Sequence, residues 1–462
     1  IREDTECIPN INEIKNSHVF QSKGFGSPIA VLKERSVSDT DGNNDAEAPR
    51  PARQKSSLNN NTVISTNINN NNTLNENRPS TTNNERTVLT AVPAVNDNEI
   101  QLIDPFANID SLLSAISIES CVNVSLSSDP NELSVLLAAG KRVSGARGAV
   151  GKKPGEGIEV SLGNKTYVLR SKAGEGAYAQ VYEAEGEELE IEDDENAAAA
   201  RRSSLETLPV YAIKVESKKL ASWEYTISKR LCERLPRGAP RDVVVPSHLR
   251  LLFDGNTSTH TTGALVMKFG DHGTLQDVIN FYKLTDSKNG TMDERLAMYY
   301  SIELLRLLEW THECDVLHCD VKPDNLLIRN GGERWMDWDS IRTGSWKKKG
   351  LALIDFGRAI DLRDYPNTTY FIGDAGTEAF SCPEMRKKNE PWLFQADLFA
   401  IAATIHVLLH GEYMDTIEDK NTGKYVPKLA FKRYWNQDVW KLVFGKLMNH
   451  PLTSKEEKPN LR

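Results

Sequence analysis

The chain has 462 residues, enough for two or three average domains, and its 56 basic and 65 acidic side chains leave a net charge of −9. This acidic balance gives no support for a protein that binds nucleic acid. The six cysteines include no Cys-x-x-Cys pair, which favours a reduced intracellular protein without a zinc site or a disulfide framework. The longest strongly apolar run, Leu398 to Leu409, is too short to span a bilayer, so we expect no membrane segment.

The beginning of the chain is polar and repetitive. Its first residue is Ile1 rather than Met, so we expect a fragment of a longer protein. Ten of the nineteen residues from Asn59 to Asn77 are Asn, and such tracts bury too little apolar surface to offset the entropy of ordering. Residues 1–96 are therefore predicted to be a disordered, Asn/Ser/Thr-rich arm. We interpret it as a solvated tether; the alternative is that short partner-binding motifs lie within it.

Residues 97–159 are predicted to be an extension and linker ahead of the main domain at 160–462. A short helix, docked on that domain, is expected from Pro105 to Ser117, with Asp110 as its N-cap. Lys141 to Gly157 is basic and Gly-rich, as linkers are. The helix is predicted from apolar residues at helical spacing, namely Ile103, Phe106, Ile109, Leu112, Leu113 and Ile116.

The main domain opens with a strand, a glycine loop and a second strand. The glycines of this loop let backbone N–H groups approach phosphate oxygens closely, although Ala179 stands where a third glycine is usual. An ordinary hairpin is the alternative for such a loop on its own. The predicted nucleotide-binding residues here are Gly174, Glu175, Gly176, Ala177 and Val181.

A charged residue interrupts the next strand, Val210 to Val215. Lys214 is placed to hold nucleotide phosphates, with Ala212 lining the same site, whereas a surface Lys on an edge strand is the alternative. Glu224 lies on a following helical pattern and is the best candidate to pair with Lys214. Glu216 and Glu233 are its rivals; Glu216 shares the strand face of Lys214 but cannot come from a helix.

Further along, Ala264 to Met267 is a buried strand that runs into a Gly-containing connection, which we interpret as a hinge between two lobes. By resemblance to the protein kinases, whose motifs are described below, Met267 is expected to line an adenine pocket and the backbone groups of Lys268 and Gly270 to bond the base. A long amphipathic helix is predicted from Asp293 to Glu313.

Two insertions are expected in the main domain. The first, 185–208, is acidic and is interpreted as a solvated loop between strands. The second, 329–350, contains Trp335, Trp338 and Trp346 and is interpreted as a hairpin that covers its own aromatic side chains rather than as a ligand site.

The richest motif is His318 to Asn325, a polar loop between apolar residues, followed thirty residues later by Asp355-Phe356-Gly357. Asp320 is predicted to orient the attacking hydroxyl and Lys322 to neutralise the transferring phosphoryl group. Asn325 and Asp355 supply hard oxygen ligands for Mg²⁺. Each residue alone could simply form a turn. Together and in this order they are typical of protein kinases.

The segment from Asp355 to Glu384 is the predicted activation segment, in which Thr377 bridges Asp320 and Lys322. Cys319 replaces an Arg that receives an activation-loop phosphate in many kinases, so we expect the site to form without that phosphate. Whether modification of Thr377 or Ser381 switches the segment is left open. Asp397 resembles a buried Asp that anchors the catalytic loop, and an ordinary N-cap is the alternative.

Several stretches resemble the Bub family of mitotic spindle-checkpoint kinases, and the resemblance covers about residues 160 to 450. Ala179 and the missing Arg at 319 are also features of that family. The stretches are Gly174 to Ala184, Trp223-Glu224, Cys232 to Leu235, Gly273 to Leu275, Asp320 to Asn325, Ala352 to Asp355, Pro391-Trp392, Gln395 to Phe399 and Ala402 to Thr404.

We therefore expect an α+β, bilobal protein kinase fold, a small antiparallel sheet lobe joined to a larger helical lobe, with ATP and Mg²⁺ as cofactors. The resemblance implies a serine/threonine kinase that phosphorylates a core histone tail and checkpoint proteins. It also implies a WD-repeat partner, bound by a segment not visible here, and action in the nucleus at kinetochores or centromeres. We expect no direct binding of nucleic acid or membrane. The alternative is a checkpoint scaffold whose kinase fold is catalytically dispensable; erosion of Lys214, Asp320 or Asp355 would favour it, and none is eroded.

Overall fold

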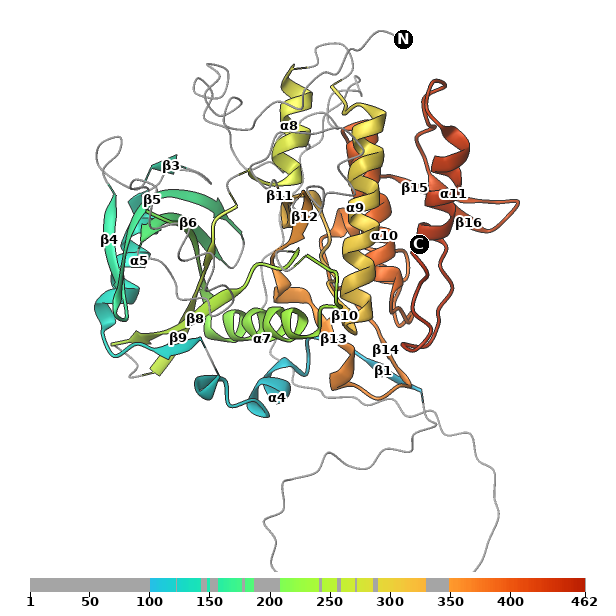
Figure 1. Cartoon of the computed structure of the whole chain (residues 1–462). Helices are drawn as coiled ribbons and strands as arrows, with labels where there is room; N and C mark the ends of the chain where they lie inside the picture. The colour runs from blue at the N-terminus through green and yellow to red at the C-terminus, as the bar shows by residue number, and fades with distance from the viewer. Residues whose placement is uncertain are drawn as a thin grey trace, which may run out of the picture. The chain divides into compact units, whose positions relative to one another are not determined.

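Two lobes form the part of the chain that the computed structural model describes (Figure 1). The described residues are 100–461, except 122, 143–147, 150–156, 177–178, 187–207, 241–242, 256–258, 271, 286–289 and 330–348, and they belong to one compact unit. The predicted arm at 1–96 and most of both predicted insertions lie outside these residues. Of the insertion boundaries, Glu185 lies in a strand, as do Arg329 and Gly350.

The elements of the first half are β1 (Gln101–Ile103), α4 (Ile109–Ser114), η1 (Ile118–Ser120), β2 (Val124–Leu126), α5 (Pro130–Arg142), β3 (Gly148–Ala149), β4 (Ile158–Leu162), β5 (Lys165–Glu175), β6 (Gln180–Gly186), β7 (Val210–Ser217), α7 (Lys218–Arg234), β8 (Ser247–Asp254) and β9 (Thr259–Lys268). Those of the second half are α8 (Leu275–Thr285), α9 (Glu294–Glu313), β10 (Val316–Leu317), η3 (Pro323–Asn325), β11 (Leu326–Arg329), β12 (Gly350–Leu353), η6 (Phe356–Arg358), β13 (Ile360–Asp361), η7 (Leu362–Asp364), β14 (Thr369–Phe371), η8 (Glu378–Phe380), α10 (Gln395–His410), β15 (Thr416–Asp419), β16 (Lys424–Pro427) and α11 (Gln437–Met448).

The small lobe is built on an eight-stranded sheet with the order β2-β8-β9-β7-β6-β5-β3, with β4 also paired to β5. All of its pairings are antiparallel except that of β2 with β8. Side chains alternate between the two faces, as the strand period requires. On β7, Tyr211 and Ile213 face the apolar cluster shared with α5, whereas Lys214 lies between Val181 of β6 and Leu265 of β9.

Helices cover both faces of this sheet. Leu133, Leu136 and Ala139 of α5 pack in one cluster with strand residues such as Tyr182, and Ala221 of α7 packs in another. In Figure 1, α7 lies between the sheet and the short strands β10 and β13. Because α7 contacts both lobes, a side chain on this helix can reach the site between them.

The predicted extension is more highly structured than the sequence pattern indicated. The helix expected from Pro105 to Ser117 is wrong in extent: α4 has six residues, and Asn108 rather than Asp110 occupies its N-cap position. Ile103 lies in β1, which pairs in parallel with β14 of the large lobe. Strand pairing, a tertiary contact, overrides the local helical spacing here.

The segment beginning at Pro130 is α5, a helix that was not predicted, and its last turn includes the start of the predicted linker at Lys141. Pro130 occupies the first helical position, where the missing N–H is tolerated. β4 begins at Ile158, so the predicted domain start at residue 160 falls inside a strand.

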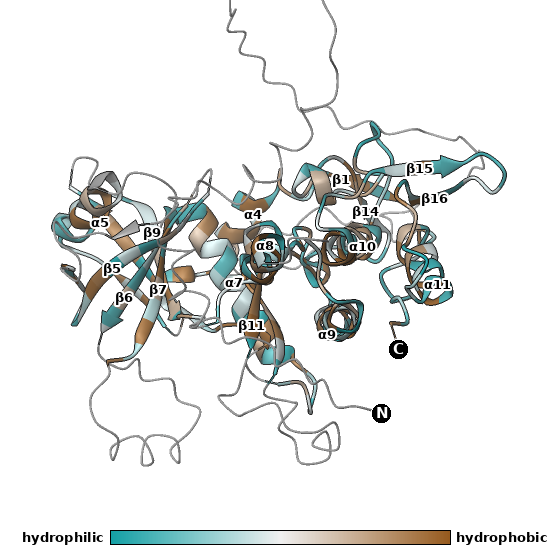
Figure 2. Ribbon diagram, turned by 90° about the horizontal axis from the view of Figure 1, so that it is seen from above, coloured by the Kyte–Doolittle hydropathy of each residue, from teal (hydrophilic) through white to brown (hydrophobic). Residues whose placement is uncertain are grey.

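The large lobe is organised around α10. This helix is buried from Gln395 to Leu409, as expected for a helix that is apolar on all sides. It is mostly brown in Figure 2 and lies among the other large-lobe helices. The predicted amphipathic helix is confirmed as α9, whose N-cap Asp293 accepts a hydrogen bond from the backbone of Arg295 at 3.0 Å. No helix among the described residues is long and apolar enough to cross a membrane.

Two short antiparallel pairs hold the loops between the lobes. β11 pairs with β12 from Leu326–Leu353 to Arg329–Gly350, and β10 pairs with β13. The first pair places the loop that precedes β11 beside the loop that follows β12. This pairing brings Asp320 and Asp355, which are far apart in the sequence, into the same region.

Candidate active site

Lys214 is held at the centre of an acidic cluster. Its ammonium contacts the Glu224 carboxylate of α7 closely, and lies 2.8 Å from Asp355 Oδ1 and 3.5 Å from Glu216 Oε2. Burial alone would lower the pKa of Lys214, but these carboxylates raise it well above its usual value, so the side chain is charged. The predicted partner Glu224 is thus brought to Lys214, and its rival Glu216 lies nearby as well.

Asp355 adopts a left-handed backbone conformation, with φ of 66°. A non-glycine residue in this region stores strain, and such strain is concentrated at functional sites. Burial would raise the pKa of Asp355, but the Lys214 ammonium more than offsets this effect and lowers the pKa to about 2. Asp355 is therefore an ionised carboxylate at neutral pH.

Asp320 lies in a second network. Thr377 Oγ1 donates to its Oδ1 at 2.7 Å, and Lys322 Nζ lies 2.7 Å from its Oδ2. Lys322 also donates to Thr377 Oγ1 at 2.9 Å, which closes a three-membered ring of contacts. The three predicted catalytic side chains are therefore adjacent, and the activation segment is tied to the catalytic loop through Thr377.

Gly376 shows why this junction needs a glycine. A Cβ atom at Gly376 would lie 2.5 Å from the carbonyl oxygen of Cys319. Cys319 itself has φ of 62° and is buried. The close backbone approach lets Thr377 reach Asp320.

The catalytic loop is anchored from the interior by Asp397. Its carboxylate accepts hydrogen bonds from the backbone N–H groups of His318 at 2.9 Å and Cys319 at 2.7 Å, and contacts His312 Nε2 at 3.0 Å. Asp397 is fully buried in α10, and Phe394 is the N-cap residue. The N-cap alternative for Asp397 is therefore wrong.

Asn325 and Asp355 fit a magnesium site. Ile354 N–H donates to the backbone oxygen of Asn325 at 3.1 Å. The two predicted ligands, Asn325 and Asp355, therefore lie on backbone segments that are next to each other. The Asn325 amide nitrogen donates to Asp320, which leaves its carbonyl oxygen for another partner. Mg²⁺ usually takes few protein ligands and completes its shell with water and phosphate. The described residues show no cluster of three or more His, Cys, Asp or Glu placed to hold a metal.

The glycine loop is open to a ligand. Gly176 N–H closes it on Ala179 O at 2.9 Å. Among the described residues, a Cβ atom would meet nothing within 4 Å at Gly174 and only Ala179 O, at 3.9 Å, at Gly176. Protein packing therefore does not require these glycines, which is consistent with space kept for phosphates. Ala177 lies outside the described residues, and the Glu175 carboxylate is paired with Lys172 at 2.8 Å.

The predicted adenine-binding residues are neighbours in the sheet and hinge. Ala212 of β7 pairs with Met267 of β9, next to Lys268. A Cβ atom at Gly270 would meet the Leu327 side chain at 3.0 Å, so Leu327 of β11 packs against the hinge. The sequence reasoning missed Leu327, whose only signal was its place in the apolar run after Asn325.

The anchors of α7 were also missed. Trp223 Nε1 donates to Ala359 O at 3.0 Å, and Arg234 holds both oxygens of the buried Asp361 at 2.8 Å. Arg230 contacts Asp361 at 2.9 Å and Asp364 at 2.7 Å. These contacts fix the helix that carries Glu224 against the segment that follows Asp355. The sequence shows that these residues are acidic or basic, but it does not show which of them pair.

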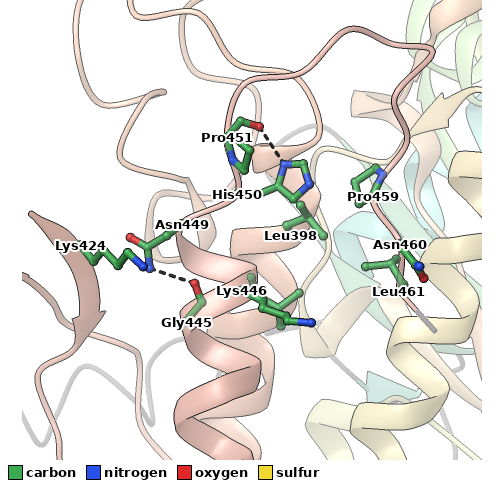
Figure 3. Close-up of a pocket in the computed structure, with 11 residues that line it drawn as sticks. Leu398, Lys424, Gly445, Lys446, Asn449, His450, Pro451, Pro459, Asn460 and Leu461 are labelled. Atoms are coloured by element: carbon green, nitrogen blue, oxygen red, sulfur yellow. Dashed lines mark hydrogen bonds between the residues drawn. The ribbon is translucent and has the colours of Figure 1, made fainter. Parts of the chain in front are cut away.

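A separate cavity of about 320 Å³ lies in the large lobe (Figure 3). None of the predicted site residues lines it. The lining residues are Leu398, Lys424, Gly445, Lys446, Leu447, Asn449, His450, Pro451, Pro459, Asn460 and Leu461.

The two-lobed fold is that of a protein kinase. The Lys214–Glu224 pair and the Asp320–Lys322–Thr377 network are arranged as such an enzyme requires. A model of the protein kinase domain matches residues 252–438. The crystal structure of the BubR1 kinase domain superposes with a TM-score of 0.58 at 24% identity, covering 78% of this chain and 91% of that one. The predicted bilobal kinase fold is thus confirmed.

Similar proteins among the protein kinases are more specific. The chain is 37% identical over 308 residues to the mitotic checkpoint serine/threonine-protein kinase BUB1 of Arabidopsis thaliana, covering 66% of this chain and 53% of the relative. It is 34% identical over 300 residues to the spindle assembly checkpoint kinase BUB1 of Saccharomyces cerevisiae, covering 63% of this chain and 26% of the relative. The kinase region of this chain is similar to the spindle-checkpoint kinases of the Bub family, the family that its sequence motifs also resemble.

Proposed function

We propose that the chain is a serine/threonine protein kinase that transfers the γ-phosphate of ATP to Ser or Thr hydroxyls of protein substrates in the spindle assembly checkpoint. The observation that carries this proposal is the simultaneous pairing of Lys214 with Glu224 and of Asp320 with Lys322 and Thr377. A degenerate site would be expected to lose one of these pairs. The chain spans about half the length of the Arabidopsis relative and about a quarter of the yeast one.

In this proposal each side chain has one role. Lys214, oriented by Glu224, holds the nucleotide phosphates as a point charge. Asp320 orients the substrate hydroxyl and accepts its proton, and Lys322 stabilises negative charge on the transferring group. Thr377 fixes the distance between Asp320 and Lys322. Asn325 and Asp355 would hold Mg²⁺, which supplies charge neutralisation at the phosphates when bound.

The finer assignments come from the family. We propose that the substrates include a core histone tail and checkpoint proteins, and that the protein works in the nucleus at mitotic kinetochores. Recruitment would involve a WD-repeat partner. The relatives are named as mitotic or spindle assembly checkpoint kinases, which supports this setting.

The first test is Mg²⁺-dependent transfer from labelled ATP to histones and to the chain itself, with Lys214→Arg and Asp320→Asn alongside. We expect Asp320→Asn to lose about 10²- to 10⁴-fold in turnover while still binding ATP, because it removes the group that orients and accepts the hydroxyl proton. Asp438→Asn, on the exposed face of α11, is the matched control and should stay active.

Normal turnover by Asp320→Asn would overturn the assignment. Tight ATP binding without transfer, in the wild-type chain as well as in the variant, would favour the scaffold alternative.

A further inference from the structure

Glu216 is a buried carboxylate that the proposed mechanism does not use. It lies two residues after Lys214 on β7, and its side chain is 4% exposed. Its Oε2 is 3.5 Å from the Lys214 ammonium, while its Oε1 is buried with no hydrogen-bond partner among the described residues. A buried ionised carboxylate normally has all its oxygens satisfied, because leaving one bare costs much of the charge's solvation.

The charge balance around Lys214 is also unusual. One ammonium faces the carboxylates of Glu216, Glu224 and Asp355, and the first two are almost fully buried. Gly263 and Thr262, the neighbours of Glu216 and Ser217 on β9, bring no charge. Carboxylates that share one buried ammonium repel one another, and this repulsion favours a proton on one of them.

Of the three carboxyl groups, that of Glu216 is the best candidate to be protonated. Asp355 and Glu224 make the shorter contacts with the ammonium, and Glu216 makes the longest. Burial, with the neighbouring carboxylates, raises the pKa of Glu216 to about 8 against the opposing pull of Lys214. Burial also raises the pKa of Glu224, so the choice of Glu216 rests on its longer contact with the ammonium.

We propose that Glu216 is a positioning residue for Lys214 that must carry a proton for the nucleotide phosphates to bind. Protonated Glu216 leaves the ammonium to Glu224 and to the phosphates. Ionised Glu216 attracts the ammonium back along the strand and adds a negative charge beside the phosphate site. This inference rests on the proposed kinase function, because it assigns Lys214 to nucleotide phosphates.

The test measures ADP and adenosine binding to the whole chain, without divalent cations, between about pH 7 and about pH 9. The second phosphate ionisation, near pH 6, lies below this window. We expect ADP affinity to fall about tenfold by one pH unit above the Glu216 pKa, since only the protonated tenth of the protein then binds. Adenosine lacks phosphates, so its affinity should stay constant.

Glu216→Gln is the matched variant, because the amide keeps the size of the side chain and is neutral at every pH. Its ADP affinity should be flat across the same window, and its KM for ATP should lose the alkaline rise while kcat is retained. The stability of this variant against thermal unfolding should also fall less than that of the wild type as the pH rises toward 8. In the wild type, the pKa of Glu216 is higher in the folded than in the unfolded state, so stability is lost with increasing pH.

The outcomes separate the two proposals. If ADP and adenosine bind but their affinities have the same pH dependence, the role of Glu216 is refuted while the kinase proposal stands. If neither nucleotide binds near neutral pH, the kinase proposal itself fails. The wild-type comparison needs no variant, so it remains decisive even if Glu216→Gln does not fold.

Discussion

At the scale of single residues, the catalytic loop depends on a buried acid whose two carboxylate oxygens both accept hydrogen bonds from the protein. This acid is Asp397. Burial alone would raise its pKa, but hydrogen bonds from His312 and from the backbone of His318 lower the pKa below its usual value. A carboxylate held in this way stabilises the fold only while it is ionised.

Asp397→Asn should therefore destabilise the protein by about 2–3 kcal/mol, because an amide cannot accept all the hydrogen bonds that the carboxylate receives. The lowered pKa places this stabilisation above about pH 4, and it should be lost as the pH falls further. Denaturant unfolding at several pH values measures the effect. The gap between variant and wild type should narrow in acid, and a constant gap would contradict the assignment.

Thr377 offers a second prediction at this scale. Thr377→Ala removes the hydroxyl that joins Asp320 to Lys322 and should lower kcat about tenfold, the equivalent of one charge-assisted hydrogen bond. Thr377→Ser keeps the hydroxyl and should retain most of the activity. Equal losses in both variants would mean that the methyl group, rather than the bridge, matters.

At the scale of elements, α7 is the link between the two lobes. Its Glu224 side chain reaches Lys214, while Trp223 and Arg234 attach the same helix to the segment after Asp355. The helix is thus held at several points along its length. Its position, and with it the Lys214–Glu224 pair, should respond to changes at those distant anchors.

Arg234→Lys tests this link. Lys cannot reproduce the two-point contact with Asp361, so α7 should loosen, with a KM for ATP raised severalfold and faster hydrogen exchange along the helix. Arg295→Lys is the control, because the Arg295 side chain is 88% exposed and forms its ion pair with Asp293, two residues away. An unchanged exchange rate in Arg234→Lys would show that the anchor is dispensable.

At the scale of the whole molecule, the extension before residue 160 is part of the folded domain. Leu133, Leu136 and Ala139 of α5 are buried in the small-lobe core, and Glu132 forms a two-point contact with Arg250 of β8. Ile109 of α4 is buried in the main cluster. Each buried aliphatic side chain contributes about 1.5–3 kcal/mol, and a domain has only about 5–15 kcal/mol in total.

A chain of residues 160–462 should therefore aggregate or unfold, whereas one of residues 97–462 should unfold cooperatively at about the wild-type temperature. Calorimetry and light scattering on the two truncated chains check this. Equal melting temperatures for both would mean that the extension packs on the domain without stabilising it.

Much of the site could be predicted from the sequence because its residues lie in short motifs. Asp320, Lys322 and Asn325 lie within one loop, and Asp355 follows a strand. Local spacing and apolar flanks suffice to recognise such motifs. The extension could not be predicted as well, since β1 exists through pairing with β14, far away in the chain.

The sequence by itself determined the bilobal kinase class, the resemblance to the Bub kinases and the candidate catalytic set, because motif order and hydrophobic pattern are local properties. Only the tertiary structure decided which acid meets which base. It brought Glu224 and Glu216 together onto Lys214, buried Asp397 beneath the catalytic loop, and tied α7 to Asp361. Such pairings join segments far apart in the chain, and the low dielectric of the interior gives them their strength.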